Sequence, residues 1–263
     1  SVLTSNNLYN WVSVGEFTPY DTSEFDTTGF DSTALSAPNA SLHSITSHNN
    51  LYVTVGDEII VSKDGYTWDT QWSFQSKLSQ QFNSVAYVTS TYYQGYVAVG
   101  YGNAPITDQS GFTTINPVSR IFTSTNGLSW SEVLPYLTDI SLNVVLSSNN
   151  VIVAAGDQYK IYASLNGNNW TEIEISGSTK TDNILNGVYA NGAFVLVGEN
   201  GTIVVSYDGV NFNEVVSNTT QKLNAVSFVD HTFIIVGDNA TILRSTDAVT
   251  WENVSLIKTE ENF

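Results

Sequence analysis

The sequence predicts an all-β protein: a single six-bladed β-propeller of four-stranded antiparallel blades. Three observations predict this fold. A short signature, S-x-[DN]-G-x-x-[WF], recurs along the chain. An apolar segment of strand length that ends in glycine precedes each copy, and Asn, Asp, Gly and Ser fill the connections. Repeats of about 40 residues with four short strands each are typical of a propeller.

The signature has five clear copies and one degenerate copy. The clear copies begin at Ser62, Ser124, Ser164, Ser206 and Ser245. The degenerate copy begins at Ser23, with Phe30 in the place of the tryptophan. Asp-Gly and Asn-Gly pairs favour type I′ hairpin turns because both residues accept a positive φ. The signature Trp is expected to cover the hydrophobic seam between neighbouring sheets.

Two further strands are predicted ahead of each signature. The nearer one covers residues 11–15, 52–56, 96–100, 151–156, 194–198 and 233–237. The earlier, inner strand opens with Phe82-Asn83, Leu142-Asn143, Leu185-Asn186 and Leu223-Asn224, with Leu42-His43 as a variant. The asparagines are expected to bond between blades rather than to line the channel. Residues 1–4 align with residues 44–47, so the chain is expected to begin within its first inner strand.

The repeat accounts for the whole chain as one domain. Residues 1–263 form a single propeller, with blades at approximately 1–36, 37–76, 77–137, 138–178, 179–217 and 218–263. The serine intervals of 39, 62, 40, 42 and 39 residues leave no room for a second domain.

The signature resembles the Asp-box, or BNR-like, repeat of sialidase-type propellers. Its combination with V-x-V-G strands is similar to propellers of the photosystem II assembly factor (Ycf48-like) group. The usual Asp-box has one more residue between Asp and Gly than this sequence has. Such repeats occur in hydrolases, lectins, assembly factors and phage tail proteins, so the resemblance implies a fold rather than one function.

Composition excludes several classes of partner and site. Twenty-five acidic and eight basic residues give a formal net charge of −17, which disfavours nucleic acid and anionic membranes. The absence of Cys excludes thiolate metal sites and thiol nucleophiles. Apolar runs have strand length, so no membrane insertion is expected. The three histidines lack metal-ligand spacing, and neither a metal nor a cofactor is expected.

Carboxylates and arginines limit the possible enzyme chemistry. The resemblance implies that a sialidase would need three arginines and an activated Tyr, but the chain has only Arg120 and Arg244. Asp139 and Asp182 are the best pair for another glycosidase, although their shared repeat position favours a turn role. The acidic residues after the strand glycines are expected to be turn residues rather than a cation ring. They are Asp57, Asp157, Glu199 and Asp238.

The third repeat carries an insertion that is the best candidate for function. Residues 100–124 connect its second strand to its signature, where the other repeats use eight residues or fewer. One face is expected to gather this insertion and the 69–81 connection, and Tyr92 and Tyr93 should lie on the opposite face. The candidate binding residues are Trp72, Phe74, Tyr101, Phe112 and Arg120. The alternative is a self-packed loop that covers the ring.

We therefore expect a non-enzymatic binding or structural module that presents the loops of a rigid propeller to a protein partner or a surface glycan. An extracellular receptor-binding component or a virion or tail component fits this reading, as part of a larger assembly. The expected location is extracellular or on a virion surface. The alternative is a carbohydrate-active enzyme of a non-sialidase type.

Overall fold

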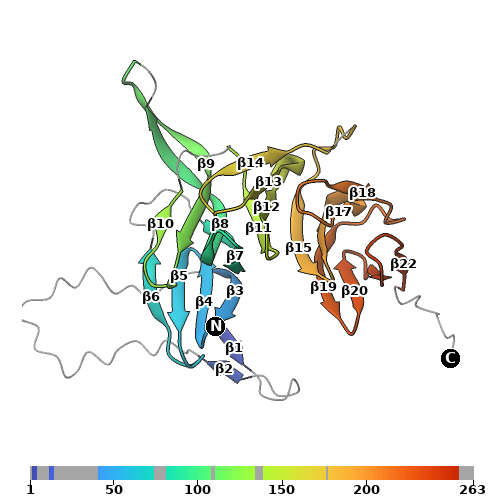
Figure 1. Ribbon diagram of the computed structural model, residues 1–263, viewed down its shortest axis with the longest axis horizontal. Coiled ribbons are helices and arrows are strands. Elements are labelled where there is room, and N and C mark those ends of the chain that lie inside the picture. The colour runs from blue at the N-terminus through green and yellow to red at the C-terminus, as the bar shows by residue number, and fades with distance from the viewer. Residues whose placement is uncertain are drawn as a thin grey trace, which may run out of the picture.

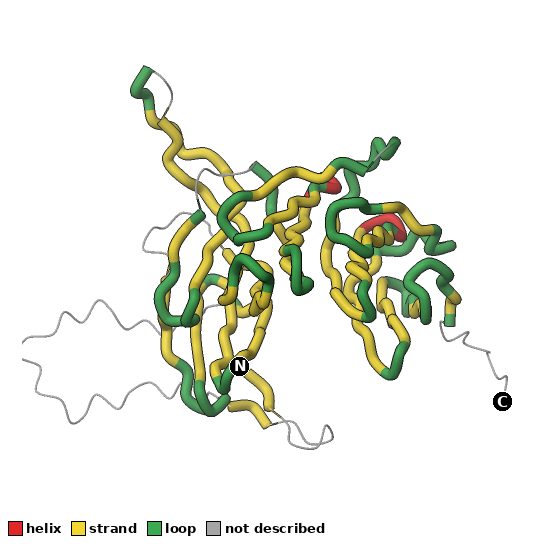
Figure 2. The backbone as a smooth tube through the Cα atoms, in the orientation of Figure 1, coloured by secondary structure: helices red, strands yellow, loops and turns green. Residues whose placement is uncertain are grey.

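The computed structural model describes residues 2–4, 12–14, 41–73, 81–107, 110–133, 139–175 and 177–254. These residues form five four-stranded antiparallel sheets and one two-stranded sheet. Figure 1 shows the five larger sheets side by side in an arc, with the first strand of each toward the inside. Within the described ranges, helix is confined to the 3₁₀ turns η2 (Asp157–Tyr159) and η3 (Glu199–Gly201) (Figure 2). The prediction of an all-β fold is confirmed.

Each large sheet is a meander of four strands that neighbour one another in chain order. The first contains β3 (Leu42–His48), β4 (Leu51–Gly56), β5 (Glu58–Ser62) and β6 (Asp69–Ser73). The second contains β7 (Gln81–Thr89), β8 (Gln94–Thr107), β9 (Thr113–Ser124) and β10 (Ser131–Glu132). The third contains β11 (Leu142–Ser147), β12 (Ile152–Gly156), β13 (Ile161–Ser164) and β14 (Trp170–Ile173). The fourth contains β15 (Ile184–Ala190), β16 (Ala193–Gly198), β17 (Ile203–Ser206) and β18 (Asn213–Val215). The last contains β19 (Leu223–Val229), β20 (Thr232–Gly237), β21 (Ile242–Ser245) and β22 (Glu252–Asn253).

The two-stranded sheet consists of β1 (Val2–Thr4) and β2 (Val12–Val14), which pair antiparallel. Val2 lies opposite Val14, as Ser44 lies opposite Val55 in the first large sheet. Val2 therefore corresponds to Ser44, and the expected alignment of residues 1–4 with 44–47 is wrong by one residue. The described chain has five four-stranded sheets, so the number of six blades stays a prediction.

The repeated signature forms the same turn in all five large sheets. The serine Oγ accepts the N–H of the Asx residue, and the Asx Oδ1 accepts the N–H groups of the second and third residues after it. In the first copy, Asp64 Oδ1 lies 2.8 Å from the nitrogens of Tyr66 and Thr67. Among these turn residues, a positive φ occurs only directly after the Asx, at Gly65, Gly127, Gly167, Gly209 and Ala248. The predicted type I′ turn is therefore wrong, because the Asx side chain and one left-handed residue close a longer connection.

The core lies between neighbouring sheets. Within the described residues, each apolar cluster joins the second and third strands of one sheet to the first and second strands of the next. Trp130 and Trp170 pack against two of these clusters, and Trp251 is buried in a third. Each signature indole also donates its N–H to the carbonyl three residues earlier. The expectation that the signature Trp covers the seams is confirmed for Trp130, Trp170 and Trp251.

The inner strands are joined by a ladder of polar side chains. Each contains a β-bulge near its start, directly after Leu42, Phe82, Leu142, Ile184 or Leu223, and a bulge redirects the extra side chain. Asn83 and Asn143 at these bulges donate from Nδ2 to the carbonyl oxygens of Leu142 and Ile184 in the next sheet, each over 2.9 Å. His43 holds the same position and lies 2.9 Å from the Phe82 oxygen. The expected bonding between blades is confirmed for Asn83 and Asn143, whereas Asn224 donates to Asp238 within its own sheet.

The fourth sheet departs from this pattern by one position. Ile184 lies opposite Gly198, as Leu142 lies opposite Gly156, so Leu185 rather than Asn186 holds the bulge. Asn186 instead accepts the N–H of Val226 in the next sheet, over 3.2 Å. The expected equivalence of Leu185-Asn186 with Leu142-Asn143 is therefore wrong by one residue. Ile184 and Leu185 are both apolar, so the sequence does not show which of them lies before the bulge and which lies at it.

Candidate binding surface

The insertion in the second large sheet forms a long β-hairpin. β8 and β9 continue past the ends of β7 and β10, and their pairing runs unbroken from Tyr96 opposite Ser124 to Thr107 opposite Thr113. Gly111, with a φ of +84°, lies in the connecting turn. We call residues 102–118 of this hairpin the arm. Figure 1 shows the arm extending away from the five sheets, so the expectation of a loop that covers the ring is wrong.

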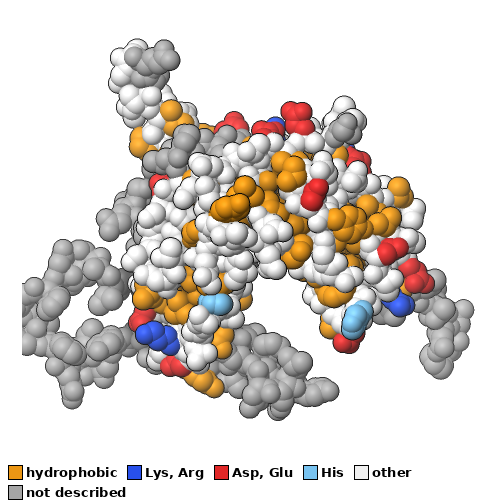
Figure 3. Space-filling model, viewed as in Figure 1, with side chains coloured by type: hydrophobic (Ala, Val, Ile, Leu, Met, Phe, Trp, Pro, Cys, Tyr) orange, Lys and Arg blue, Asp and Glu red, His pale blue; other side chains and the backbone are white. Residues whose placement is uncertain are grey.

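The outer part of the arm exposes apolar side chains. Ile106 is 39% exposed, Ile115 is 54% exposed and Phe112 is 67% exposed. Residues that lie directly opposite each other share a face of a two-stranded ribbon. Pro105 and Ile115 therefore share one face, whereas Ile106 lies on the other. No charged residue occurs among the described residues of the arm, and on the face that Figure 3 shows none of their atoms is red or blue.

The base of the arm is anchored by a buried charge pair. Arg120 Nε lies 2.7 Å from Glu132 Oε1, and the Arg120 side chain is 8% exposed. Its Nη1 donates to the Asn103 oxygen over 3.4 Å, and its guanidinium carbon lies 5.5 Å from the centre of the Phe122 ring. Ser119 Oγ donates to the Ile140 oxygen over 2.8 Å. These contacts join the arm to β10 and to the connection that leads to the third sheet.

The predicted binding residues do not form one patch. Trp72 lies in β6 opposite Ile59, and Phe74 lies outside the described residues. Tyr101 is half-buried at the start of the arm, and Phe112 lies near its tip. Arg120 is buried at the base and offers almost no surface to a ligand. Their role in binding stays a prediction.

Tyr92 and Tyr93 lie in the connection between β7 and β8, at the end of the sheet opposite the arm. Tyr92 is 69% exposed. The Tyr93 hydroxyl donates to the oxygens of Tyr96 and Ser124 over 2.9 and 3.1 Å. Burial raises the pKa of Tyr93 to about 12, so this tyrosine is a neutral structural residue at physiological pH.

A polar cavity of about 390 Å³ lies beside the base of the arm. Tyr101 lines it together with Gln81, Asn83, Asp139 and Asp157. A neighbouring cavity of about 530 Å³ shares Asn83 and Asp157 and extends along the inner strands to Lys222. The two cavities therefore place one aromatic ring beside amides and carboxylates at the inner edge of the sheets.

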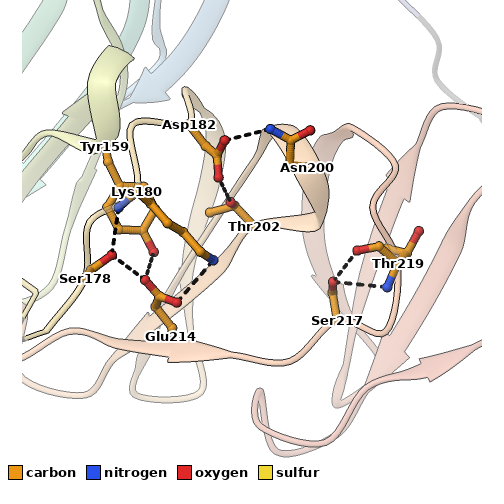
Figure 4. Close-up of polar contacts among 9 residues, drawn as sticks. All are labelled: Tyr159, Ser178, Lys180, Asp182, Asn200, Thr202, Glu214, Ser217 and Thr219. Atoms are coloured by element: carbon orange, nitrogen blue, oxygen red, sulfur yellow. Dashed lines mark hydrogen bonds and ion pairs between the residues drawn. The ribbon is translucent and has the colours of Figure 1, made fainter.

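A second group of polar residues surrounds Glu214 in β18 (Figure 4). Tyr159 and Ser178 donate their hydroxyls to Glu214 Oε1 over 3.0 and 2.6 Å, and Lys180 Nζ lies 3.1 Å from Oε2. Burial alone would raise the pKa of Glu214, but these three donors lower it below its usual value. Burial, together with the Glu214 carboxylate, raises the pKa of Tyr159.

Lys180 and Glu214 line two cavities, of about 670 and 380 Å³. No sequence pattern points to this cluster, because its members come from two separate connections and from β18 and share no motif. Its three donors hold Glu214 as a carboxylate, so the cluster fixes the connection between the third and fourth sheets.

Asp139 and Asp182, the candidate pair for a glycosidase, lie in different surroundings. Asp182 accepts hydrogen bonds from Asn200 Nδ2 over 2.7 Å and Thr202 Oγ1 over 3.2 Å (Figure 4). Asp139 is exposed and lines the 390 Å³ cavity, to which Asp182 does not contribute. The contacts of Asp182 support the turn role that its repeat position suggests.

The acidic residues that follow the strand glycines hold the inner strands in place. Asp57 and Glu199 accept the backbone N–H of Ser41 and Asn183 over 2.8 and 3.2 Å. Asp157 and Asp238 accept inner-strand asparagine amides over 2.8 and 2.7 Å. Their predicted role in turns is confirmed. Within the described ranges, no group of three or more His, Asp or Glu is placed to hold a metal ion.

No helix among the described residues combines the length and apolarity that a membrane span requires. No model of a protein family matches the sequence, and no curated protein matches it either. The chain is nevertheless similar in structure to several solved proteins.

Three of the most similar solved structures have a TM-score of 0.56 with this chain. The first is YCF48 bound to a D1 peptide, which is 16% identical; the match covers 82% of this chain and 67% of that one. The second is YCF48 from Cyanidioschyzon merolae, which is 15% identical, with coverage of 81% and 72%. The third is Sqt1 from Saccharomyces cerevisiae, which is 10% identical, with coverage of 83% and 62%. All three are β-propellers, and at these identities the likeness shows the fold alone. The chain therefore has a β-propeller fold.

Proposed function

We propose that the chain is a non-enzymatic binding module that presents the arm to a protein partner. The observation that carries this proposal is the arm itself: a ribbon whose described residues carry no charge, which projects from the sheets and exposes Ile106, Phe112 and Ile115. Exposed apolar side chains gathered on one element are typical of interaction sites. A two-stranded ribbon contributes little to the stability of the fold on its own. The arm is therefore better explained by contact with a partner than by a structural role.

The similar structures support a protein as the class of partner. One YCF48 structure holds a D1 peptide, so the propeller fold serves as a peptide-binding scaffold in that protein. The acidic charge of this chain favours a partner with basic residues around an apolar contact, because opposite charges steer association. The same charge disfavours nucleic acid.

Shortening the arm tests this function. Ala104 lies opposite Asn116, so an Asn-Gly turn that replaces residues 105–115 closes the hairpin and keeps its buried base. We expect affinity capture from the source organism to enrich a protein with the full chain but not with the shortened one. Capture of the same protein by both chains would contradict the proposal.

Point variants refine this test with the captured protein in purified form. Ile115→Asp places a charge on the arm and should weaken the affinity by about tenfold or more, as expected for a residue central to an interface. Val210→Asp is the matched control, because Val210 is 49% exposed on a signature turn. Equal affinities of the two variants would exclude Ile115 from the interface. Unchanged melting temperatures would show that both variants fold.

A surface glycan is the second candidate partner, and the 390 Å³ cavity favours it. Tyr101 offers an aromatic face beside the amides of Gln81 and Asn83, a combination that suits hydroxyl-rich rings. Glycan-array binding that is lost in Tyr101→Ala and kept in Tyr92→Ala would support this role. Hydrolysis of a bound glycan that disappears in Asp139→Asn would instead favour the alternative of a carbohydrate-active enzyme.

We also propose a place for the module on an extracellular or virion surface, within a larger assembly. The abundance of Asn, Ser and Thr and the absence of Cys support this assignment. Immunogold labelling of intact cells or particles tests it, and labelling confined to the cell interior would contradict it. Six blades are the proposed scaffold, since six copies of the signature occur in the sequence.

A further inference from the structure

The last sheet has one face that the other sheets bury. The residue before the closing glycine of the second strand is fully buried at Val55, Val99, Ala155 and Val197. These positions pack against the following sheet. At the equivalent position of the last sheet, Val236 is 45% exposed. Ile234 and Ile242 on the same face are only half-buried.

The first large sheet shows the same deficiency on its opposite face. Ile45 is 54% exposed and Leu42 is 37% exposed, although their counterparts in the other four large sheets are buried or are glycine. Those counterparts contact the preceding sheet. In addition, the buried Thr54 Oγ1 has no hydrogen-bond partner among the described residues, and an unsatisfied buried hydroxyl costs about 1–3 kcal/mol.

We call these two faces the closing seam: Ile234, Val236 and Ile242 on the last sheet, and Leu42 and Ile45 on the first. Figure 1 places the two sheets at opposite ends of the arc. An arc that leaves apolar faces at both ends gains free energy when a further layer of strands covers both faces. The strands that fill this gap must therefore carry apolar residues on both of their faces, one toward the last sheet and one toward the first large sheet.

The strand pair β1–β2 has this pattern in the required register. Leu3 lies opposite Ser13, as Ile45 lies opposite Thr54, so Leu3 holds a position that contacts the preceding sheet elsewhere in the molecule. Val12 and Val14 hold the positions of Val53 and Val55, which contact the following sheet. The pair thus supplies apolar residue types at the positions of both faces.

We propose that β1–β2 of the same chain occupies the closing seam and completes the ring. The register then places Leu3 on the side of the last sheet, and Val12 and Val14 on the side of the first large sheet. Residues 15–41 connect the pair to β3, and 27 residues span up to about 90 Å when extended, so the connection reaches the seam. A tethered segment competes at a millimolar effective concentration, which favours it over a second copy at micromolar protein.

This inference rests on the proposed six-blade scaffold and is independent of the partner of the arm. The inner-strand contacts of the described sheets supply a template for its test. Ser44 and Ser84 accept the N–H groups of Val85 and Val145 in the next sheet, over 3.2 and 3.1 Å. By register, Ala225 of the last sheet corresponds to the serine and Leu3 to the residue that donates its N–H, where the last sheet meets the strand pair. Where the strand pair meets the first large sheet, Val2 corresponds to the serine and Ile45 to the donor.

The chain has no Cys, so pairs of introduced cysteines report directly on these contacts in the full-length protein. We expect Leu3→Cys with Ala225→Cys, and Val2→Cys with Ile45→Cys, to be bridged within one chain by a short bismaleimide. At about 10 µM protein, bridging within a chain should be roughly a hundredfold faster than bridging between chains. Peptide mapping and non-reducing gels distinguish the two products.

Two control pairs make each outcome decisive. Ser84→Cys with Val145→Cys lies across a seam that the structure shows and should be bridged at a similar rate. Leu3→Cys with Val210→Cys joins the strand pair to a turn remote from the inner strands and should not be bridged. Bridged dimers would assign the seam to a second copy and overturn the proposal. If neither seam pair is bridged while the Ser84–Val145 control is bridged, the proposal is also overturned. This outcome does not depend on which protein the chain with the shortened arm captures.

Discussion

At the scale of single residues, the signature turn explains why either Asp or Asn stands at its second conserved position. A side-chain oxygen that accepts two backbone N–H groups is the requirement, and both residue types provide it. The charged versions add a dependence on pH. Backbone N–H donors, from Thr67 for Asp64 and Asn211 for Asp208, lower the pKa of each carboxyl. The N–H of Thr250 likewise lowers the pKa of Asp247 to about 2.

The Asp turns should make the protein sensitive to acid. Each carboxyl has a lower pKa in the folded chain than its ordinary value of 3.8. Their stabilisation is therefore complete above about pH 4 and is lost as the pH falls toward about 2. We expect the triple variant Asp64→Asn, Asp208→Asn, Asp247→Asn to lose less unfolding free energy than the wild type over this range. Urea titrations at several pH values measure the two slopes, and equal slopes would count against the prediction.

The turn glycines should differ in their tolerance of a methyl group. Gly167 and Gly209 both have a φ near +74°, where an L-residue costs about 1–2 kcal/mol. A Cβ at Gly167 would meet Thr123 at an ordinary 3.4 Å, whereas one at Gly209 would lie 2.4 Å from Val151 Cγ1. We expect Gly209→Ala to lose about 2–4 kcal/mol of unfolding free energy and Gly167→Ala about 1 kcal/mol. Urea denaturation measures both, and equal losses would refute the role of the Val151 contact.

At the scale of elements, the arm combines an apolar surface with edges that resist strand addition. Within the described chain, residues 102–107 pair with the arm's own second strand and with no other strand. Pro105 lies opposite Ile115, and Pro117 lies opposite Asn103. Proline has no N–H for the ladder, so at these alternate positions each edge lacks one outward donor. This arrangement leaves the side-chain faces, rather than the edges, available to a partner.

Restoring the missing donors should make the protein self-associate. We expect Pro105→Thr with Pro117→Thr to form dimers or larger species through edge-to-edge pairing, at concentrations where the wild type is monodisperse. Sedimentation velocity measures this change. Thr107→Val with Thr113→Val is the control, because it makes the arm more apolar without adding a backbone donor. Equal association of both variants would attribute the effect to hydrophobicity and contradict the edge argument.

At the scale of the whole molecule, the sequence predicts the structural features that recur in every repeat, and it does not predict those that occur only once. Five copies of the signature predict the five large sheets and the covering role of Trp130, Trp170 and Trp251. The register of the fourth inner strand was missed because Ile184 and Leu185 both suit its first position. The arm was placed correctly in the chain, but its continuous pairing depends on Tyr101–Thr107 matching Thr113–Ser119 across a turn. The Glu214 cluster gave no signal, because Tyr159, Ser178 and Lys180 meet it only through tertiary folding.

The inner-strand ladder also determines how cooperativity passes through the molecule. Each described sheet exchanges its amide and hydroxyl bonds with its immediate neighbours alone, as Asn83 does with Leu142 and Asn143 with Ile184. The protein therefore behaves as a short one-dimensional array, in which opening one sheet costs its own stability plus two interface energies. Sheets at the ends of an open arc have one interface fewer and exchange their amide hydrogens first. A closed ring removes this distinction, because in a ring no sheet is terminal.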